Sequence, residues 1–237
     1  MISETTAAIL AGGFGKRLRP IVSDRPKALA AVCNRPFILF LLDQLIAANI
    51  ESAVLCIGYL GEKIKETLGH RYRSLSLLYS QETEPLGTAG ALRRASPLFG
   101  SNSVLVMNGD SYFKAHLGVF CQWHRTQQSN ASLLLTKVSN TNRFGRVIVA
   151  RDGKIKCFQE KGEAKKSGWI NAGIYMFENH VIQSIPANRD VSLEHETFPG
   201  LIGQGLFGLK SEGFFVDIGT PSSYIKAQTY FDHPGSI

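Results

Sequence analysis

The chain has 237 residues, of which 44% are hydrophobic and 19% are charged, and its formal net charge is +7. This length can bury a full core without disulfides, and the four cysteines and six histidines show no zinc-site spacing. No apolar run approaches the roughly 20 residues that span a bilayer, and residues 1–5 show no secretory signal, so we expect a cytoplasmic protein. The cations are scattered along the chain, so the charge favours small anionic ligands over nucleic acid.

Predicted strands and helices alternate as far as residue 138. The apolar run Thr6–Leu10 is typical of a buried strand, and later apolar runs predict further strands. These strands cover residues 53–57, 75–79, 103–107 and 132–138, and helical spacing of apolar residues predicts helices over residues 37–48, 61–68, 87–99 and 116–127. The alternation predicts the α/β class, with βαβ units stacked into a doubly wound, mostly parallel mixed sheet.

The pattern changes after residue 145. Residues 146–150 and 154–158 flank a turn at Arg151-Asp152-Gly153, which predicts a β-hairpin. Strands are expected over residues 169–177, 206–210 and 213–216, and helices around residues 178–184, 191–197 and 221–231. No repeat follows Asp217, so we expect no C-terminal β-helix. We predict one domain over residues 1–237, in which the segments before and after about residue 140 share one sheet.

The loop directly after the first strand is rich in glycine. Its glycines can adopt positive φ and let backbone N–H groups approach a ligand closely. Cations follow this loop at once or a few residues later: Lys16, Arg17, Arg19 and Lys27. Such a loop is typical of polyphosphate binding, although it fits neither the P-loop nor the dinucleotide-binding fingerprint. A glycine-rich turn beside a solvated basic patch is the plainer alternative.

The string G-G-x-G-x-R-L-x-P with a downstream R-P-K resembles the sugar-phosphate nucleotidyltransferases. Further family blocks follow in the family order: PLGTAGAL at 85–92, MNGD at 107–110, FG at 144–145, QEK at 159–161, NAGIY at 171–175 and VDIGTP at 216–221. The resemblance therefore covers nearly the whole chain. It implies a Rossmann-like nucleotidyltransferase fold, with a nucleotide-binding half up to about residue 140 and a sugar-phosphate-binding half after it.

The resemblance also implies roles for the matching residues. The catalytic set would be Arg17, Lys27, Asp110 and Asp217. The nucleotide would contact Leu10, Ala11, Gly12, Gly13, Gly15, Gln81, Glu82, Gly87, Asn108 and Gly109. The sugar phosphate would contact Thr88, Gly145, Glu160, Lys161, Asn171 and Gly173. Asp110 and Asp217 would together hold Mg²⁺, a hard cation that uses one or two carboxylates plus phosphate oxygens.

Plainer alternatives stand beside several of these assignments. Each aspartate could cap a turn or a helix, Glu82 could lie in a solvated turn, and Gly145 and Gly173 could mark a β-bulge or a strand bend. The sequence also departs from the family at two positions, because Lys16 replaces the usual Thr or Ser and Ala28 replaces the usual Pro. These departures leave the fine specificity open.

The implied reaction is in-line attack of a sugar 1-phosphate on the α-phosphorus of a nucleoside triphosphate, with release of pyrophosphate. Residues 85–92 look most like guanylyltransferases, which implies GTP, and the short form of the chain resembles those that act on D-glycero-D-manno-heptose 1-phosphate. Mannose 1-phosphate guanylyltransferases and uridylyl-transferring relatives are the alternatives. A non-catalytic nucleotide-sugar sensor on the same fold is a reading from a different class. The oligomeric state stays open, a homodimer being one option.

Overall fold

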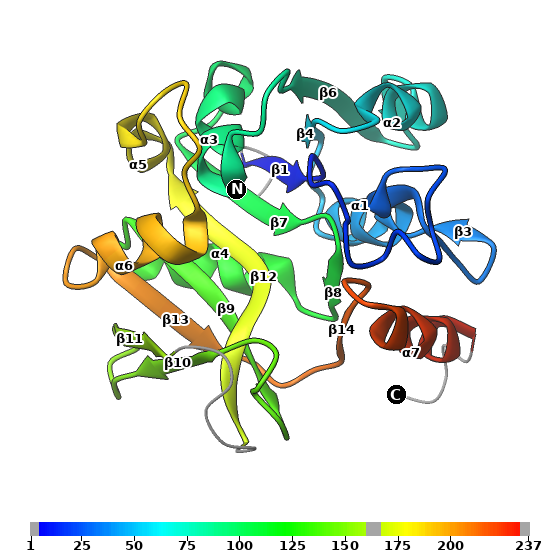
Figure 1. Cartoon of the computed structure of the whole chain (residues 1–237). Coiled ribbons are helices and arrows are strands. Elements are labelled where there is room, and N and C mark those ends of the chain that lie inside the picture. Colours follow the sequence, from blue (N-terminus) through cyan, green and yellow to red (C-terminus); the bar gives the residue numbers. More distant parts are fainter. Residues whose placement is uncertain (1–4, 160–166, 233–237) are drawn as a thin grey trace.

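The computed structural model describes residues 5–159 and 167–232, and an eight-stranded sheet forms its centre (Figure 1). In spatial order its strands are β13 (Leu206–Lys210), β9 (Ala131–Val138), β12 (Gly168–Glu178), β7 (Ser103–Asn108), β1 (Thr6–Leu10), β4 (Ser52–Ile57), β6 (Leu75–Gln81) and β5 (Arg71–Tyr72). The glycine-rich loop therefore leaves the sheet from one of its central strands.

Most strand pairs of this sheet are parallel. β1 pairs in parallel with β4 and β7, β4 with β6, and β13 with β9. In contrast, β12 is antiparallel to both of its neighbours, β7 and β9, and β5 is antiparallel to β6. The sheet is thus mixed and mostly parallel, which confirms the predicted α/β class.

Helices cover both faces of the sheet (Figure 1). Successive side chains of a strand point to opposite faces, and in β1 Ala7 and Ile9 belong to one core whereas Ala8 belongs to the other. The first core takes side chains from α1 (Ile38–Ala47), α2 (Gly61–Leu68), α4 (Leu117–Thr126) and α7 (Pro221–Asp232). The second takes them from α3 (Gly87–Ala95), α5 (Asn179–Ser184), the π-helical turn η4 (Leu193–Thr197) and α6 (Phe198–Leu201). In the part of the chain that is described, no helix has the length and apolarity to cross a membrane.

Three short ladders lie outside the main sheet. β10 (Arg146–Val149) pairs with β11 (Ile155–Gln159), β8 (Ser111–Phe113) with β14 (Phe215–Asp217), and β2 (Ala31–Val32) with β3 (Arg35–Pro36). The first is the predicted hairpin. In the second, β14 corresponds to the strand expected over residues 213–216, but β8 was not predicted, because a three-residue strand carries too little periodicity. This ladder joins the carboxyl end of β7 to the start of α7.

Two predicted helices differ from the observed elements. The helix expected over residues 87–99 ends at Ala95 and continues as the 3₁₀ turn η3 (Ser96–Leu98), because Pro97 lacks the N–H that an α-helix needs. The helix expected around residues 191–197 is the π-helical turn η4. A further 3₁₀ turn, η2 (Lys27–Leu29), follows the glycine-rich loop. The division into two halves falls between β9 and β10 and remains a prediction.

Candidate active site

A small cavity lies where the glycine-rich loop meets the end of β7. Its volume is about 220 Å³, and the candidates that line it are Leu10, Ala11, Gly13, Gly15, Arg17, Lys27, Gly109 and Asp110. Lys16 and Ala28, the two departures from the family pattern, line it as well. Residues predicted to hold the triphosphate thus surround one space, although they come from the glycine-rich loop, η2 and the end of β7.

Two glycines allow this cavity to form. Gly15 has a φ of +59°, a conformation that L-residues rarely adopt, and a Cβ there would lie 3.3 Å from the Cβ of Lys27. A Cβ on Gly109 would lie 2.7 Å from the carbonyl oxygen of Leu10, to which the Gly109 N–H donates a hydrogen bond. The ends of β1 and β7 can therefore approach each other only with glycine at position 109.

A second, larger cavity of about 520 Å³ adjoins the first. The predicted residues that line it are Arg17, Gly87, Thr88, Asn108, Asp110, Gly145, Asn171, Gly173 and Asp217. Glu160 and Lys161 lie outside the described residues, although Gln159, which precedes them, lines this cavity. Gly87 and Asn108 were expected to contact the nucleotide, and the structure places both in this cavity and not in the smaller one.

Close contacts and positive φ angles explain two glycines of the larger cavity. Gly87 has a φ of +68°, and a Cβ there would lie 2.4 Å from Asp190 Oδ1 and 2.5 Å from the carbonyl oxygen of Val191. Gly173 has a φ of +76°, and its Cβ would lie 2.3 Å from the Oγ of Ser111. The register of β12 also shifts near Gly173, so the expected β-bulge and the expected place beside a ligand cavity occur together.

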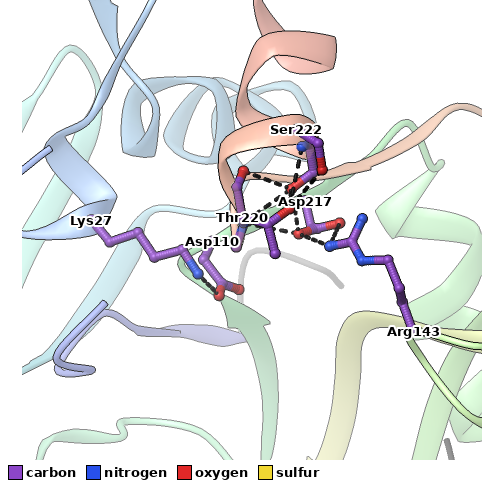
Figure 2. A network of polar contacts seen from close by, with 8 residues as sticks. Lys27, Asp110, Arg143, Asp217, Thr220 and Ser222 are labelled. Carbon is purple, nitrogen blue, oxygen red and sulfur yellow. Dashed lines mark hydrogen bonds and ion pairs between the residues drawn. The ribbon is translucent and has the colours of Figure 1, made fainter. Parts of the chain in front are cut away.

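The two candidate metal ligands lie beside each other. Asp217 ends β14 and pairs with Ser111 of β8, the residue that follows Asp110, and the Ile218 N–H donates to the Asp110 carbonyl at 2.9 Å. Figure 2 shows Lys27 reaching Asp110 and Arg143 reaching Asp217. The first ion pair has an Nζ–Oδ2 distance of 2.5 Å, and the second joins one Arg143 nitrogen to both Asp217 oxygens at 3.0 and 3.1 Å.

Asp217 is held more firmly than Asp110. Its Oδ1 accepts hydrogen bonds from the Gly219 N–H at 2.8 Å and the Ser223 hydroxyl at 2.9 Å. Gly219 lies just before α7 and Ser223 lies in its first turn, at the end of the helix where its dipole favours negative charge. The Asp217 side chain is 13% exposed, whereas that of Asp110 is 43% exposed. Asp217 is therefore pre-positioned by the protein, and Asp110 is the more accessible carboxylate.

The two carboxylates fit a magnesium ion that is shared with phosphate groups. Within residues 5–159 and 167–232, no three His, Cys, Asp or Glu side chains gather into a metal site, so Asp110 and Asp217 stand there as a pair of carboxylates. Over the same residues, Oδ1 of Asp110 has no hydrogen-bond partner and Oδ2 of Asp217 has only Arg143. Hard oxygen ligands with unused positions suit Mg²⁺, which takes its remaining ligands from phosphate and water.

Glu82 lies behind the glycine-rich loop, outside both cavities. Its Oε1 lies so close to Gly12 and Gly58 that a Cβ on these glycines would come within 2.8 and 2.6 Å of it. Burial raises the pKa of Glu82 above its ordinary value. The neighbouring Gln81 side chain accepts a hydrogen bond from Lys65 Nζ at 2.6 Å, so its carbonyl is already engaged. The side chain beside the loop is therefore the Glu82 carboxylate, whereas the Gln81 amide points to Lys65.

Several polar residues of the larger cavity were not predicted as site residues, and two of them, Arg143 and Glu194, are used below. Arg143 stands directly before the FG block at 144–145, a position that could have pointed to it. Glu194 lies in the segment where a short helix was expected, around residues 191–197, and no local pattern marks it as a site residue. Only the packing of η4 against α3 brings Glu194 to the cavity.

Comparisons with known proteins show the family of this chain. Residues 6–233 match the nucleotidyl transferase family. The D-glycero-alpha-D-manno-heptose 1-phosphate guanylyltransferase of Aneurinibacillus thermoaerophilus is 34% identical over 228 residues, which cover 96% of this chain and 98% of that protein. The mannose-1-phosphate guanylyltransferase of Mycobacterium tuberculosis is 32% identical over 227 residues, which cover 94% of this chain and 63% of that protein. The structure of HddC from Yersinia pseudotuberculosis complexed with GMP-PN has a TM-score of 0.84 and 26% identity, and the match covers 96% of this chain and 99% of that one.

Proposed function

The chain belongs to the nucleotidyl transferase family, and from this premise we propose that it transfers GMP from GTP to a sugar 1-phosphate and releases pyrophosphate. The sugar phosphate that we propose first is D-glycero-α-D-manno-heptose 1-phosphate. The relative from Aneurinibacillus thermoaerophilus carries that activity in its name and matches this chain over 98% of its own length. The product, GDP-heptose, would serve a surface polysaccharide or glycoprotein, and we propose a cytoplasmic site of synthesis.

One observation carries the proposal: two cavities of different chemistry share part of their walls. Glycine-loop backbone and cations line the smaller cavity, which suits a triphosphate. Hydroxyl, amide and carboxylate side chains line the larger one together with arginines and aromatic rings, which suits a sugar phosphate. The residues common to both are Arg17, Asp110 and Gly219. Transfer between two bound substrates needs such a meeting point, and positioning them there supplies much of the rate acceleration.

The proposed chemistry is in-line displacement at the α-phosphorus of GTP. A phosphate oxygen of the sugar 1-phosphate forms the new P–O bond, and the bond to the β-phosphate breaks as pyrophosphate leaves. Arg17, on the wall shared by both cavities, would neutralise charge on the transferred phosphorus and the leaving group. Lys27 would contact the triphosphate. Lys161 would hold the phosphate of the incoming sugar, and Glu160 would accept hydrogen bonds from the sugar hydroxyls. No nucleophilic side chain is needed.

Asp110 and Asp217 would hold the Mg²⁺ ion of this reaction. Bound Mg²⁺ supplies charge neutralisation and orientation of the phosphate oxygens. In the described structure Lys27 and Arg143 balance the two carboxylates, which keeps two neighbouring negative charges compatible before substrates arrive. Glu82, whose Oε1 lies beside Gly12 and Gly58, would accept hydrogen bonds from N1–H and N2–H₂ of guanine.

Mannose 1-phosphate is the second candidate acceptor, because the relative from Mycobacterium tuberculosis carries that activity in its name. The test is pyrophosphate release with Mg²⁺ across a grid of the common nucleoside triphosphates against heptose, mannose and glucose 1-phosphates. We expect the largest kcat/KM with GTP and the heptose phosphate. A maximum with mannose 1-phosphate or UTP would correct the sugar or the base. If no pair of substrates releases pyrophosphate but calorimetry still detects nucleotide binding, the non-catalytic sensor would be favoured.

A further inference from the structure

The larger cavity holds a carboxylate, Glu194, to which neither the sequence motifs nor the comparisons give a role. It lies on η4, the π-helical turn that packs against α3, and it is half-buried. Because a carboxylate repels phosphate, Glu194 does not suit the phosphate of either substrate. A neutral group that donates hydrogen bonds, such as a sugar hydroxyl, is the partner that its chemistry fits.

One oxygen of Glu194 is fixed and the other is free. Oε2 accepts hydrogen bonds from the Thr88 hydroxyl at 3.1 Å and the Ser192 hydroxyl at 3.3 Å. Oε1 has no hydrogen-bond partner among residues 5–159 and 167–232, and the same residues offer Glu194 no ion pair. The carboxylate is therefore oriented by the protein through one oxygen, which leaves the other to accept donors from a ligand.

Thr88 is a positioning residue in this arrangement. Its Oγ1 accepts a hydrogen bond from the Leu193 N–H at 2.8 Å, and its hydroxyl donates a hydrogen bond to Glu194. Thr88 also stands in the first turn of α3, directly after Gly87, where the chain passes close to Asp190 and Val191. The threonine expected to contact the sugar thus joins α3 to η4 and holds the carboxylate of Glu194.

The rest of this wall is built for a polar ligand. Asn108 and Asn171 donate to the hydroxyl of Tyr175 at 3.2 and 2.9 Å, and burial followed by the negative charge of Glu194 raises the pKa of Tyr175 well above its ordinary value. Asn108 Oδ1 and Ser111 Oγ are buried, and within the described chain neither has a hydrogen-bond partner. Buried polar atoms normally have partners, so their place on the cavity wall points to a ligand that supplies them.

We propose that Glu194 accepts hydrogen bonds from ring hydroxyls of the sugar and that Thr88 positions it for this role. The proposal deepens the function proposed above and rests on it. A site built around an oriented carboxylate discriminates strongly, because a sugar that lacks the matching hydroxyl leaves the charged oxygen unpaired and desolvated. Glu194 would thereby help to decide which sugar 1-phosphate is accepted, independently of the nucleotide.

Glu196 offers a matched control on the same turn. It is two residues from Glu194, it pairs with Arg189 at 2.7 Å, its side chain is 43% exposed, and it does not line the cavity. The experiment compares Glu194→Gln with Glu196→Gln, using the sugar phosphate and nucleotide that the wild type prefers. We expect the KM for the sugar phosphate to rise about tenfold or more in Glu194→Gln, because a hydrogen bond to a charged group is lost. The KM for the nucleotide should change less than about twofold in both variants.

Binding measured without turnover gives a second readout. Calorimetry with GDP-mannose and with GDP separates the sugar contribution from the nucleotide contribution. In Glu194→Gln the preference for GDP-mannose over GDP should fall about tenfold, whereas in Glu196→Gln it should stay as in the wild type. Thr88→Val should raise the KM for the sugar phosphate roughly threefold or more, and Thr88→Ser, which keeps the hydroxyl, should restore it.

The outcomes separate this inference from the proposed function. A wild type that releases no pyrophosphate with any pair in the grid overturns the proposed function. An active wild type whose sugar-phosphate KM and GDP-mannose preference are unchanged in Glu194→Gln overturns the inference alone. If Glu194→Gln fails to fold, the Thr88→Val and Thr88→Ser pair decides: equal sugar-phosphate KM values in both variants would contradict the role of Glu194.

Discussion

Asp110 and Asp217 are 107 positions apart in the sequence numbering, yet the β8–β14 ladder places them beside each other. Their motifs could be found in the sequence because each carboxylate follows an apolar strand within a family block. Their pairing could not, because β8 is a three-residue strand with no periodic signal of its own, so nothing in the sequence joins it to the strand expected over residues 213–216. The ion pairs of Asp110 with Lys27 and of Asp217 with Arg143 could not be predicted from the sequence either.

Removing single charges from the shared wall should stop turnover without unfolding the protein. We expect Asp110→Asn and Arg17→Ala to lower kcat/KM by about 10³-fold or more. Asp110→Asn weakens the proposed Mg²⁺ site, and Arg17→Ala removes a cation that stabilises the transferred phosphoryl group. Both residues are partly exposed, so the Tm should change by only a few degrees at most. The checks are the pyrophosphate assay and thermal unfolding, and near-normal turnover in either variant would show that the site assignment is wrong.

Arg143 should compete with a divalent cation for Asp217. In Arg143→Gln the Asp217 carboxylate loses its ion-pair partner, so we expect Mn²⁺ to bind roughly two- to fivefold more tightly in the absence of nucleotide, a range typical of a partly exposed ion pair. Electron paramagnetic resonance of free Mn²⁺ measures this affinity. Arg151→Gln, in the exposed hairpin turn, is the control that keeps the same change of net charge. Equal Mn²⁺ affinities in all three proteins would contradict the competition.

Most elements could be predicted, because the apolar runs of β1, β4 and β7 and the helical spacing of α2 match the structure with small shifts in bounds. The less regular elements could not. A π-helical turn such as η4 has no simple period, and its direction depends on the close passage of residues 190–191 beside Gly87. Glu194 was missed for the same reason, since its place in the cavity is a result of tertiary packing and not of a local pattern.

Helix α4 carries a buried histidine that should make stability depend on pH. His124 contacts Ser132 of β9 at 2.8 Å and Glu178 of β12 at 3.1 Å, and burial lowers its pKa despite the Glu178 carboxylate. In the unfolded chain this histidine binds a proton more readily than in the folded chain. The free energy of unfolding should therefore fall as the pH drops through about 6.5, by at most about 1.4 kcal/mol per pH unit for this one group.

Urea unfolding at a series of pH values between 5 and 8 measures this dependence. We expect His124→Asn to flatten its part of the slope, whereas His70→Asn, at an exposed position outside the sheet, should leave the slope as it is. A slope that is identical in the wild type and His124→Asn would mean that His124 binds protons equally in both states.

The whole molecule is tied together by β12, which enters the sheet antiparallel between β7 and β9. Strands from before and after residue 140 therefore share one hydrogen-bonded ladder, and we expect them to unfold in one cooperative transition. Trp123 lies on α4 and Trp169 on β12, so the single-tryptophan variants Trp123→Phe and Trp169→Phe report on the two segments separately. Their fluorescence transitions in urea should coincide with the circular dichroism transition. Two separated midpoints would show that the halves unfold independently.

The wall formed by η4 has a consequence for how such an enzyme diversifies. The residues of η4 belong to none of the strands described, so substitutions there leave the register of the sheet untouched. The smaller cavity, which we propose for the triphosphate, is in contrast built at the ends of the central strands β1 and β7, which the core fixes. Mutations in η4 could therefore change which sugar 1-phosphate is accepted while the nucleotide stays the same. A directed-evolution library confined to residues 190–197 would test this by screening for new nucleotide sugars.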